Sequence, residues 1–293
     1  MKQKIDRNEI VAAVRRVPLI STSASRLLQI ANHNGHSLAD IVTIVKCDAA
    51  LTIHILKVVN SAALSRGREI HSLDRAIAIM GEEMVMGIAM SDAAGQLFQA
   101  DLAGYAANRG DLWRHDLRTA IAAKRIASFA KVEVNHDLAF TSGLLHDLGK
   151  AIISDFLKGT TEEIVTAIEA GQFEDYPAAE REELGVDHCD IGFELATYWG
   201  LPEPLLSVIR HHHHPLAAAE PYRPLVYVVH LGDIVAMMTG SGTGADAMRC
   251  NIDPAYGDYV NLAKDDLARI IFEAETEFTA LISSLSGEGE QKP

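Results

Sequence analysis

Residues 143–150 of the 293-residue chain read GLLHDLGK, and this stretch is the most informative part of the sequence about the fold. In a helical frame Phe140, Leu144 and Asp147 share one face, so a carboxylate falls on an apolar stripe, and His146 projects about 100° away from it. Burial of a carboxylate is unfavourable unless a cation or hydrogen-bond donors compensate it. The pair is therefore either a local hydrogen-bonded His-Asp pair or part of a metal centre, and a metal centre requires further ligands.

Comparable polar residues lie on apolar helical faces elsewhere in the second half of the chain. DLWRHDLRTAIAAKRIASF places Asp111 and His115 one turn apart on an inward face, and VDHCDIGFELATYW places His188 on the face of Leu195. Asp233 lies within VVHLGDIVAMM, where almost every neighbour is apolar. Each case alone fits a hydrogen-bonded core histidine or a capped carboxylate. Together, within one part of the chain, they indicate a metal centre.

Four consecutive histidines occur in VIRHHHHP, residues 208–215, far from either end of the chain. The helix predicted before them turns its leucine, valine and isoleucine side chains inward. One further turn on that face brings His212 and His213 to the same side, whereas His211 and His214 follow the polar side. We expect two of these rings to bind metal and the other two to line the rim or meet solvent.

Apolar residues recur at three- and four-residue spacing along the chain without sustained two-residue alternation, which predicts an all-α fold. Asp48 and Ser72 precede two of the helical patterns and are predicted N-caps. In the first hundred residues the predicted helices are 7–16, 21–32, 37–46, 48–64, 73–80 and 83–99.

The stretch DLAGYAANRGD interrupts the helical pattern and marks a predicted lobe boundary. We expect an N-terminal helical lobe over residues 1–105 and a second, metal-binding lobe over residues 106–286. The remaining residues, 287–293, carry nothing apolar to bury and are expected to be disordered.

Composition excludes several functional classes. The net charge of −14 argues against non-specific binding to nucleic acid or to anionic membranes. The N-terminus lacks the apolar run of a signal peptide, and PLVYVVHLGDIVAMM is too short to span a bilayer. Three widely spaced cysteines, Cys47, Cys189 and Cys250, suggest reduced thiols that serve as small core residues. We expect a soluble cytoplasmic protein.

The order of these motifs is similar to a known family. His115, HDLGK, HCDIG, a histidine pair and Asp233 follow one another as in the HD superfamily of metal-dependent phosphohydrolases. VKCDAALTIHILKVVNSAAL followed by REIHSLDRAIAIMGEEMVM resembles the HDOD domain, the HD-related output domain of bacterial signalling proteins. The resemblance covers about residues 17–281 and implies a two-lobed, all-α HDOD fold with an HD-type helical core in the C-terminal lobe.

HDOD proteins commonly lack much of the metal-binding set, whereas this chain keeps a candidate at every position. The ligands implied by the resemblance are Asp111, His115, His146, Asp147, His188, His212, His213 and Asp233. This number suits two divalent ions bridged by Asp147. Because no thiolate is among them, iron or manganese is favoured, with zinc, nickel and cobalt as alternatives.

The same resemblance implies roles in catalysis. Two ions about 3.5–4 Å apart could clamp a phosphodiester and lower the pKa of water towards neutrality. Lys150 matches the lysine of the family's His-Asp-x-Gly-Lys motif and, with Asp147, is the implied catalytic residue, although a solvent-facing lysine is the alternative. Arg114 and Arg210 are weaker phosphate candidates, for which surface salt bridges are the alternative.

Three functions follow from the resemblance. The first is a regulatory HDOD module that binds metal and passes a signal to a protein partner or responds to a nucleotide ligand. The second is a metal-dependent phosphohydrolase acting on a nucleotide or cyclic dinucleotide, and the third is an iron-centred sensor of oxygen or redox state. HD-GYP phosphodiesterases, which hydrolyse cyclic di-GMP, carry a Gly-Tyr-Pro segment after the histidine pair, where this chain reads HPLAAAEPYRP. The regulatory role is therefore favoured, with an oligomeric state that the sequence leaves open.

Overall fold

The computed structural model describes residues 7–31, 37–60, 70–93, 95–98, 101–240, 244–248 and 251–286. Within these ranges the regular elements are helices, and the extended pairing is limited to two isolated bridges, Leu102 with Ala107 and Ala130 with Val260. The predicted all-α class is confirmed. The tail predicted to be disordered, 287–293, lies outside the described residues, as do residues 32, 61–64, 94 and 99 of three predicted helices.

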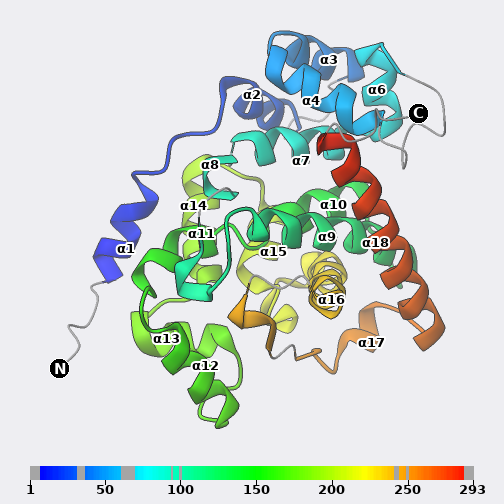
Figure 1. Cartoon of the computed structure of the whole chain (residues 1–293). Coiled ribbons are helices and arrows are strands. Elements are labelled where there is room, and N and C mark those ends of the chain that lie inside the picture. The colour runs from blue at the N-terminus through cyan, green and yellow to red at the C-terminus, as the bar shows by residue number, and fades with distance from the viewer. Residues whose placement is uncertain are drawn as a thin grey trace, which may run out of the picture.

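The first hundred residues form short helices close to the predicted positions. They are α1 (Arg7–Val14), α2 (Thr22–Ala31), α3 (Leu38–Lys46), α4 (Ala49–Val59), α6 (Leu73–Met80), α7 (Glu82–Ala93) and α8 (Gly95–Phe98). Both predicted N-caps are confirmed: Asp48 accepts from the backbone N–H of Leu51 at 3.1 Å, and Ser72 accepts from that of Arg75 at 3.4 Å. In Figure 1, α2, α3, α4 and α6 gather at one end of the molecule, and α7 lies between them and α10.

The second part of the chain contains the longer helices. They are α9 (Asp111–Ile126), α10 (His136–Leu145), α11 (Lys150–Ile153), α12 (Thr161–Glu169), α13 (Tyr176–Leu184), α14 (His188–Trp199), α15 (Glu203–His211), α16 (Arg223–Met238), α17 (Tyr256–Tyr259) and α18 (Lys264–Ser286). Short 3-10 helices connect several of them: η1 (Ala103–Tyr105), η2 (Ala127–Phe129), η3 (Ser154–Phe156), η4 (Pro215–Ala217), η5 (Glu220–Tyr222) and η6 (Ala245–Met248). None of the described helices combines the length and the apolar composition needed to cross a bilayer.

Helix α9 lies at the centre of this part, packed against α10, α16 and α18 (Figure 1). Small residues allow the close approach of its neighbours: a Cβ at Gly143 of α10 would lie 2.7 Å from the Cα of Ala120. Residues on nearly every side of α9 are consequently buried, including the polar His115 and Asp116. A helix enclosed in this way holds its polar side chains in fixed positions.

Helix α18 fastens α9 through charged pairs. Arg118 of α9 donates to both carboxylate oxygens of Glu275 of α18, at 2.7 and 2.9 Å. Its guanidinium also stacks over the ring of Phe278, which lies on α18. Arg125 donates to Glu273 at 2.5 Å and to Glu277 at 2.6 Å. Bidentate and networked arginine pairs of this kind are geometrically restrictive. They fix the helix that carries His115.

The first helix of the chain lies apart from the other N-terminal helices. α1 packs against α11 and α14 of the second part, and Trp199 of α14 donates its indole N–H to the carbonyl of Pro18 at 3.2 Å. The division at residue 105 stays a prediction. The N-terminal segment nevertheless contacts helices that, as described below, flank the candidate metal centre.

Candidate metal centre

Seven of the eight predicted ligands come together from five regions of the second part of the chain. His115 lies on α9, His146 and Asp147 directly follow α10, and Asp233 lies on α16. His188 opens α14, and the pair His212 and His213 directly follows α15. Their side chains are buried, except that of His213, which is partly exposed.

Asp147 stands at the centre of these residues, and its two carboxylate oxygens face different histidines. Oδ1 lies 3.4 Å from Nε2 of His188 and 3.4 Å from Nε2 of His212. Oδ2 lies 3.6 Å from Nε2 of His115 and 3.4 Å from Nε2 of His146. The carboxylate therefore divides the histidines into an Oδ1 side and an Oδ2 side.

Asp233 completes the Oδ2 side. Its Oδ1 lies 3.0 Å from Nε2 of His115 and 3.8 Å from Nε2 of His146. Two carboxylates and two imidazoles thus surround one small region, a donor set that suits iron, manganese or zinc.

The ring orientations of three histidines are set by their other nitrogen. Nδ1 of His146 donates to the carbonyl of Gly143 at 2.8 Å, and Nδ1 of His212 donates to the carbonyl of Ile209 at 3.1 Å. Nδ1 of His188 donates to the Glu180 carboxylate at 2.8 Å. Since carbonyl and carboxylate oxygens only accept, Nδ1 carries the hydrogen in each ring. In its neutral form each of these rings presents the lone pair of Nε2 to Asp147, the arrangement that metal-ligating histidines adopt.

Lone pairs that face a carboxylate repel it unless a cation lies between them. Among the described residues, the buried Asp147 Oδ1 and His146 Nε2 have no hydrogen-bond partner. Buried polar atoms are otherwise almost always paired. The residues present therefore fit a bound divalent cation beside Asp147.

The pKa shifts describe how the same residues balance charge when protons are the only cations. Although burial opposes ionisation of Asp147, His146 and Lys150 hold its pKa well below its usual range. Burial also opposes protonation of His212 and His188. Nonetheless, Cys189 and Asp147 raise the pKa of His212 to about 10, and Glu180 raises that of His188 well above its ordinary value.

Binding of divalent cations should therefore release protons. His188 and His212, whose folded-state pKa values are raised, are protonated at pH 7 in the metal-free protein, and metal ligands must be deprotonated. We expect at least about two protons released per chain at pH 7. Calorimetric titration of manganese in buffers of different ionisation enthalpy measures this number, and fewer than about one proton per chain would contradict the ligand assignment.

The structure does not bring Asp111 into the cluster. Its carboxylate, at the start of α9, accepts from the backbone N–H of Asn108 at 2.8 Å and pairs with Arg114 at 3.2 Å. Asp116, which was not predicted, is fully buried on the same helix, with Oδ1 3.6 Å from Nδ1 of His146. Asp111 thus binds a preceding loop residue and an arginine and lies outside the cluster. Burial and then the charge of Asp147 raise the pKa of Asp116, which lies behind His146, well above its usual range.

Glu180 of α13 is a second residue that sequence reasoning missed. It is fully buried, accepts from both Nδ1 and the backbone N–H of His188 at 2.8 Å, and accepts from the Tyr105 hydroxyl at 2.5 Å. Burial raises its pKa, but His188 outweighs that effect and leaves it below the ordinary value. Glu180 is therefore an ionised carboxylate that orients His188.

Substitution of Glu180 by glutamine should weaken the cation on the Oδ1 side by about 10- to 100-fold, because loss of an orienting carboxylate has this effect in metal centres. Competition with a chromophoric chelator measures the change. The matched control is Glu182→Gln, which alters an exposed residue of the same helix and should leave the affinity unchanged. Equal affinities in the two variants would show that Glu180 does not support a metal ligand.

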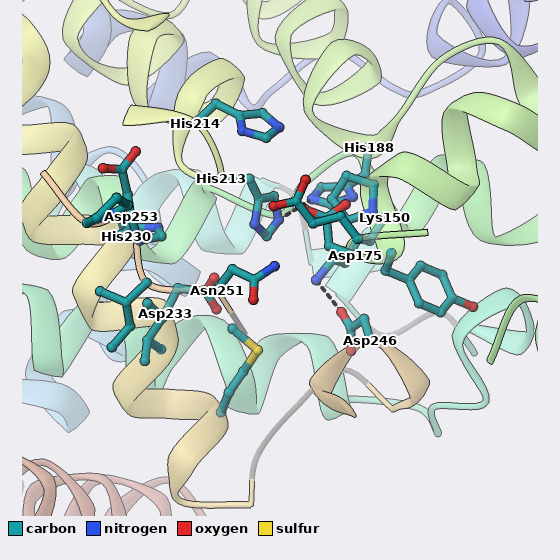
Figure 2. Close-up of a pocket in the computed structure, with 17 residues that line it drawn as sticks. Lys150, Asp175, His188, His213, His214, His230, Asp233, Asp246, Asn251 and Asp253 are labelled. Atoms are coloured by element: carbon teal, nitrogen blue, oxygen red, sulfur yellow. Dashed lines mark hydrogen bonds and ion pairs between the residues drawn. The ribbon is translucent and has the colours of Figure 1, made fainter. Parts of the chain in front are cut away.

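A cavity of about 180 Å³ opens on the cluster (Figure 2). His188, His213 and Asp233 reach its wall, and His214 of the histidine run lines it as expected for a rim residue. Four further carboxylates line it, those of Glu174, Asp175, Asp246 and Asp253, beside neutral polar and apolar side chains. Among the described lining residues, Lys150 is the only lysine and arginine does not occur.

Lys150 is buried, so the alternative of a solvent-facing lysine is wrong. Its ammonium lies 2.5 Å from Asp147 Oδ2 and also pairs with Asp246 of η6. Although burial opposes its charge, these aspartates raise its pKa well above the ordinary value, and the group stays cationic. The weaker phosphate candidates are surface pairs instead: Arg114 binds Asp111, and Arg210 lies 3.5 Å from Asp190.

Comparisons with known proteins agree with this fold. The HDOD domain family matches residues 17–215, a range that ends before Asp233. An uncharacterized protein of Treponema pallidum (strain Nichols) is 29% identical over 219 residues, which cover 73% of this chain and 41% of that protein. The chain thus spans about two-fifths of the length of this curated relative.

Two solved structures have a similar fold. A proposed signal transduction protein of Marinobacter aquaeolei VT8 is 21% identical, with a TM-score of 0.72, over 98% of this chain and 66% of that one. A proposed phosphohydrolase of Shewanella amazonensis SB2B is 21% identical, with a TM-score of 0.69, over 94% of this chain and 97% of that one. At these identities the likeness establishes the fold alone.

Proposed function

The chain belongs to the HDOD domain family, and from this membership and its site we propose that it is a regulatory signal-transduction protein that binds two divalent cations and passes a signal to a partner protein. One observation carries the proposal: the buried Asp147 presents each of its oxygens to a different pair of imidazoles. A carboxylate in this position can bridge two cations.

The cavity supports a regulatory role over hydrolysis of a dinucleotide. Its volume of about 180 Å³ is below the roughly 300–1,000 Å³ of sites that enclose drug-sized ligands. Its carboxylates repel polyanions, and the charge of Lys150, the lysine among the described lining residues, is already balanced by Asp147 and Asp246. The Marinobacter structure, described as a proposed signal transduction protein, agrees with this role.

Metal-dependent partner capture tests the proposal. Immobilised manganese-loaded protein and the His146→Ala, Asp147→Ala double variant are exposed to native lysate, and retained proteins are quantified. We expect at least one protein to be retained about tenfold more by the loaded protein, a difference of about 1.4 kcal/mol in binding free energy. Equal retention under every metal condition would contradict a metal-dependent signalling role.

A phosphohydrolase is the second candidate, favoured by the opening of the cavity onto Lys150, His188 and Asp233. Bound cations would supply electrostatic stabilisation of a phosphoryl group. In this role Lys150 would neutralise a phosphoryl oxygen, and Asp147 would hold the cations. Iron- or manganese-loaded protein is assayed against phosphomonoesters and phosphodiesters. Turnover clearly above that of the double variant would favour this candidate over the regulatory one.

A further inference from the structure

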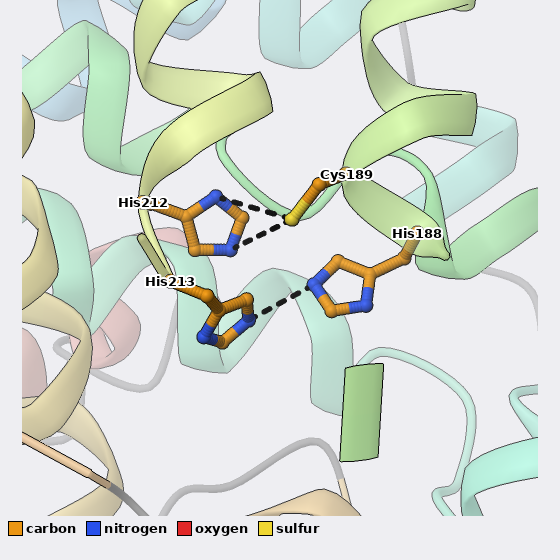
Figure 3. Close-up of side chains that lie close together, drawn as sticks. All are labelled: His188, Cys189, His212 and His213. Atoms are coloured by element: carbon orange, nitrogen blue, oxygen red, sulfur yellow. Dashed lines mark hydrogen bonds between the residues drawn. The ribbon is translucent and has the colours of Figure 1, made fainter. Parts of the chain in front are cut away.

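Four potential ligands meet where the start of α14 faces the end of α15 (Figure 3). They are His188, Cys189, His212 and His213, and each offers an atom within 4.8 Å of those of the others. Nε2 of His188 lies 3.0 Å from Nε2 of His213. This group contains His188 and His212 of the Oδ1 side, together with the neighbouring ring of His213 and the thiol of Cys189.

The thiol of Cys189 is buried and in contact with the group. Its side chain is 4% exposed and free of any disulfide, and Sγ lies 3.9 Å from both ring nitrogens of His212. By contrast, Cys47 is exposed, contrary to the expectation of a core residue, and Cys250 lies outside the described residues. Cys189 alone among the described cysteines is placed to reach a cation.

A second observation points to a cation at the same place. Asp147 Oδ1 is fully buried, has no hydrogen-bond partner among the described residues, and is aimed at Nε2 of His188 and Nε2 of His212, 3.4 Å from each. An anionic oxygen and the imidazole nitrogens converge on one point beside the sulfur. A cation bound at this point would pair with all of these atoms.

The separations fit the edges of a tetrahedral site. With metal–nitrogen and metal–oxygen bonds of about 2.0–2.1 Å, ligand atoms at tetrahedral angles lie about 3.4 Å apart. A sulfur bonded at about 2.3 Å lies about 3.6 Å from such nitrogens. The observed 3.4 Å edges match, and the 3.9 Å separation of Sγ from His212 Nε2 needs to shorten by only a few tenths of an ångström.

We infer that Cys189 is a thiolate ligand of the cation on the Oδ1 side, and that the two sides of Asp147 therefore select different metals. Sulfur and imidazole favour zinc or another thiophilic ion on the Oδ1 side. On the Oδ2 side, His115, His146 and Asp233 provide only nitrogen and oxygen, which suit manganese or iron. When the sulfur–metal bond forms, the thiol proton passes to solvent. This inference rests on the two-cation centre proposed above.

Cobalt(II) reports directly on the sulfur ligand, because a thiolate–cobalt bond gives a charge-transfer band in the near ultraviolet. The chain is prepared with Cys47→Ser and Cys250→Ser, so that Cys189 is the remaining thiol, and is compared with a version that also carries Cys189→Ser. We expect the band in the first protein and its loss in the second, with at least a tenfold weaker zinc affinity. X-ray absorption of the zinc-loaded wild type should show sulfur at about 2.3 Å and requires no variant.

The outcomes separate this inference from the proposed centre. Cobalt bound by the wild type without the band, or zinc surrounded only by nitrogen and oxygen, would refute the role of Cys189 and leave the two-cation centre in place. Failure of the wild type to bind any cobalt or zinc would refute the centre and the inference together. Persistence of the band after Cys189→Ser would also overturn the assignment.

Discussion

Asp147→Asn is expected to abolish binding of both cations, lowering the metal content from about two ions per chain to near zero. The side chain is fully buried, and its two oxygens face opposite sets of imidazole nitrogens. An asparagine keeps the shape but removes the charge and replaces one oxygen by a hydrogen-bond donor. Elemental analysis after dialysis against manganese or zinc measures the result.

Variants that remove a histidine from only one side of Asp147 test whether this carboxylate bridges two cations or binds one. His188→Ala should remove the ion on the Oδ1 side, and His115→Ala the ion on the Oδ2 side, so each variant retains about one ion per chain. Asp155→Asn, at an exposed position, should retain both. If Asp147→Asn retained one ion, the carboxylate would serve a single side, and the bridging arrangement would be wrong.

Among the proposed substitutions, Gly149→Ala is expected to lower the stability of the fold the most. A Cβ at this position would lie 1.8 Å from the carbonyl oxygen of His188 and 2.6 Å from the backbone nitrogen of Gly192. Both conflicts are with backbone atoms of α14, so no side-chain rotation relieves them. The free energy of unfolding should fall by at least about 3 kcal/mol, and displacement of His188 should weaken the Oδ1 side as well.

The loss of stability expected for Gly149→Ala comes from steric overlap and not from the backbone conformation of this residue. Gly149 has φ of −65° and ψ of −29°, values that alanine adopts readily. The control is Gly257→Ala in α17, where an added Cβ meets nothing within 4 Å and stability should stay the same or rise slightly. Chemical denaturation of both variants is the measurement, and equal midpoints would show that α14 does not pack on Gly149 as described.

Helical periodicity in the sequence was sufficient to predict much of the fold. The three- and four-residue spacing predicted the all-α class and placed most N-terminal helices within a few residues of their observed bounds. It also placed Asp147 and the pair His212 and His213 on inward faces, where the structure buries Asp147 and His212 and partly exposes His213. These positions follow from local geometry, which a sequence specifies directly.

The incorrect and missed site residues are those whose burial depends on helices far away in the sequence. Asp111 was assigned to the inward face of a helix assumed to have one such face, whereas α9 is enclosed by α10, α16 and α18, and Asp116 is buried as well. The sequence held one signal for Asp116, because it forms a second His-Asp pair with His115. Glu180 carried no such signal, since only tertiary packing separates it from the exposed Glu182 on the same helix.

The proposed sulfur ligand also depends on how distant helices pack. The resemblance implies no thiolate ligand and so favours iron or manganese, a prediction that stays open, although Cys189 stands directly beside His188 in HCDIG. Its contact with His212 joins the start of α14 to the end of α15, and such a contact appears only when both helices are placed. Lys150 and Asp246, 96 residues apart, are a further pair of this kind.

The acidic wall of the cavity also governs how quickly the centre exchanges with its surroundings. The carboxylates that line the cavity outnumber its lysine, and their negative potential raises the local concentration of divalent cations and speeds the encounter of these cations with the histidines. This attraction reaches about 8–10 Å at physiological salt and shrinks as ionic strength rises. Rising salt therefore slows the entry of cations through this mouth, which operates as an electrostatic funnel for positive ions.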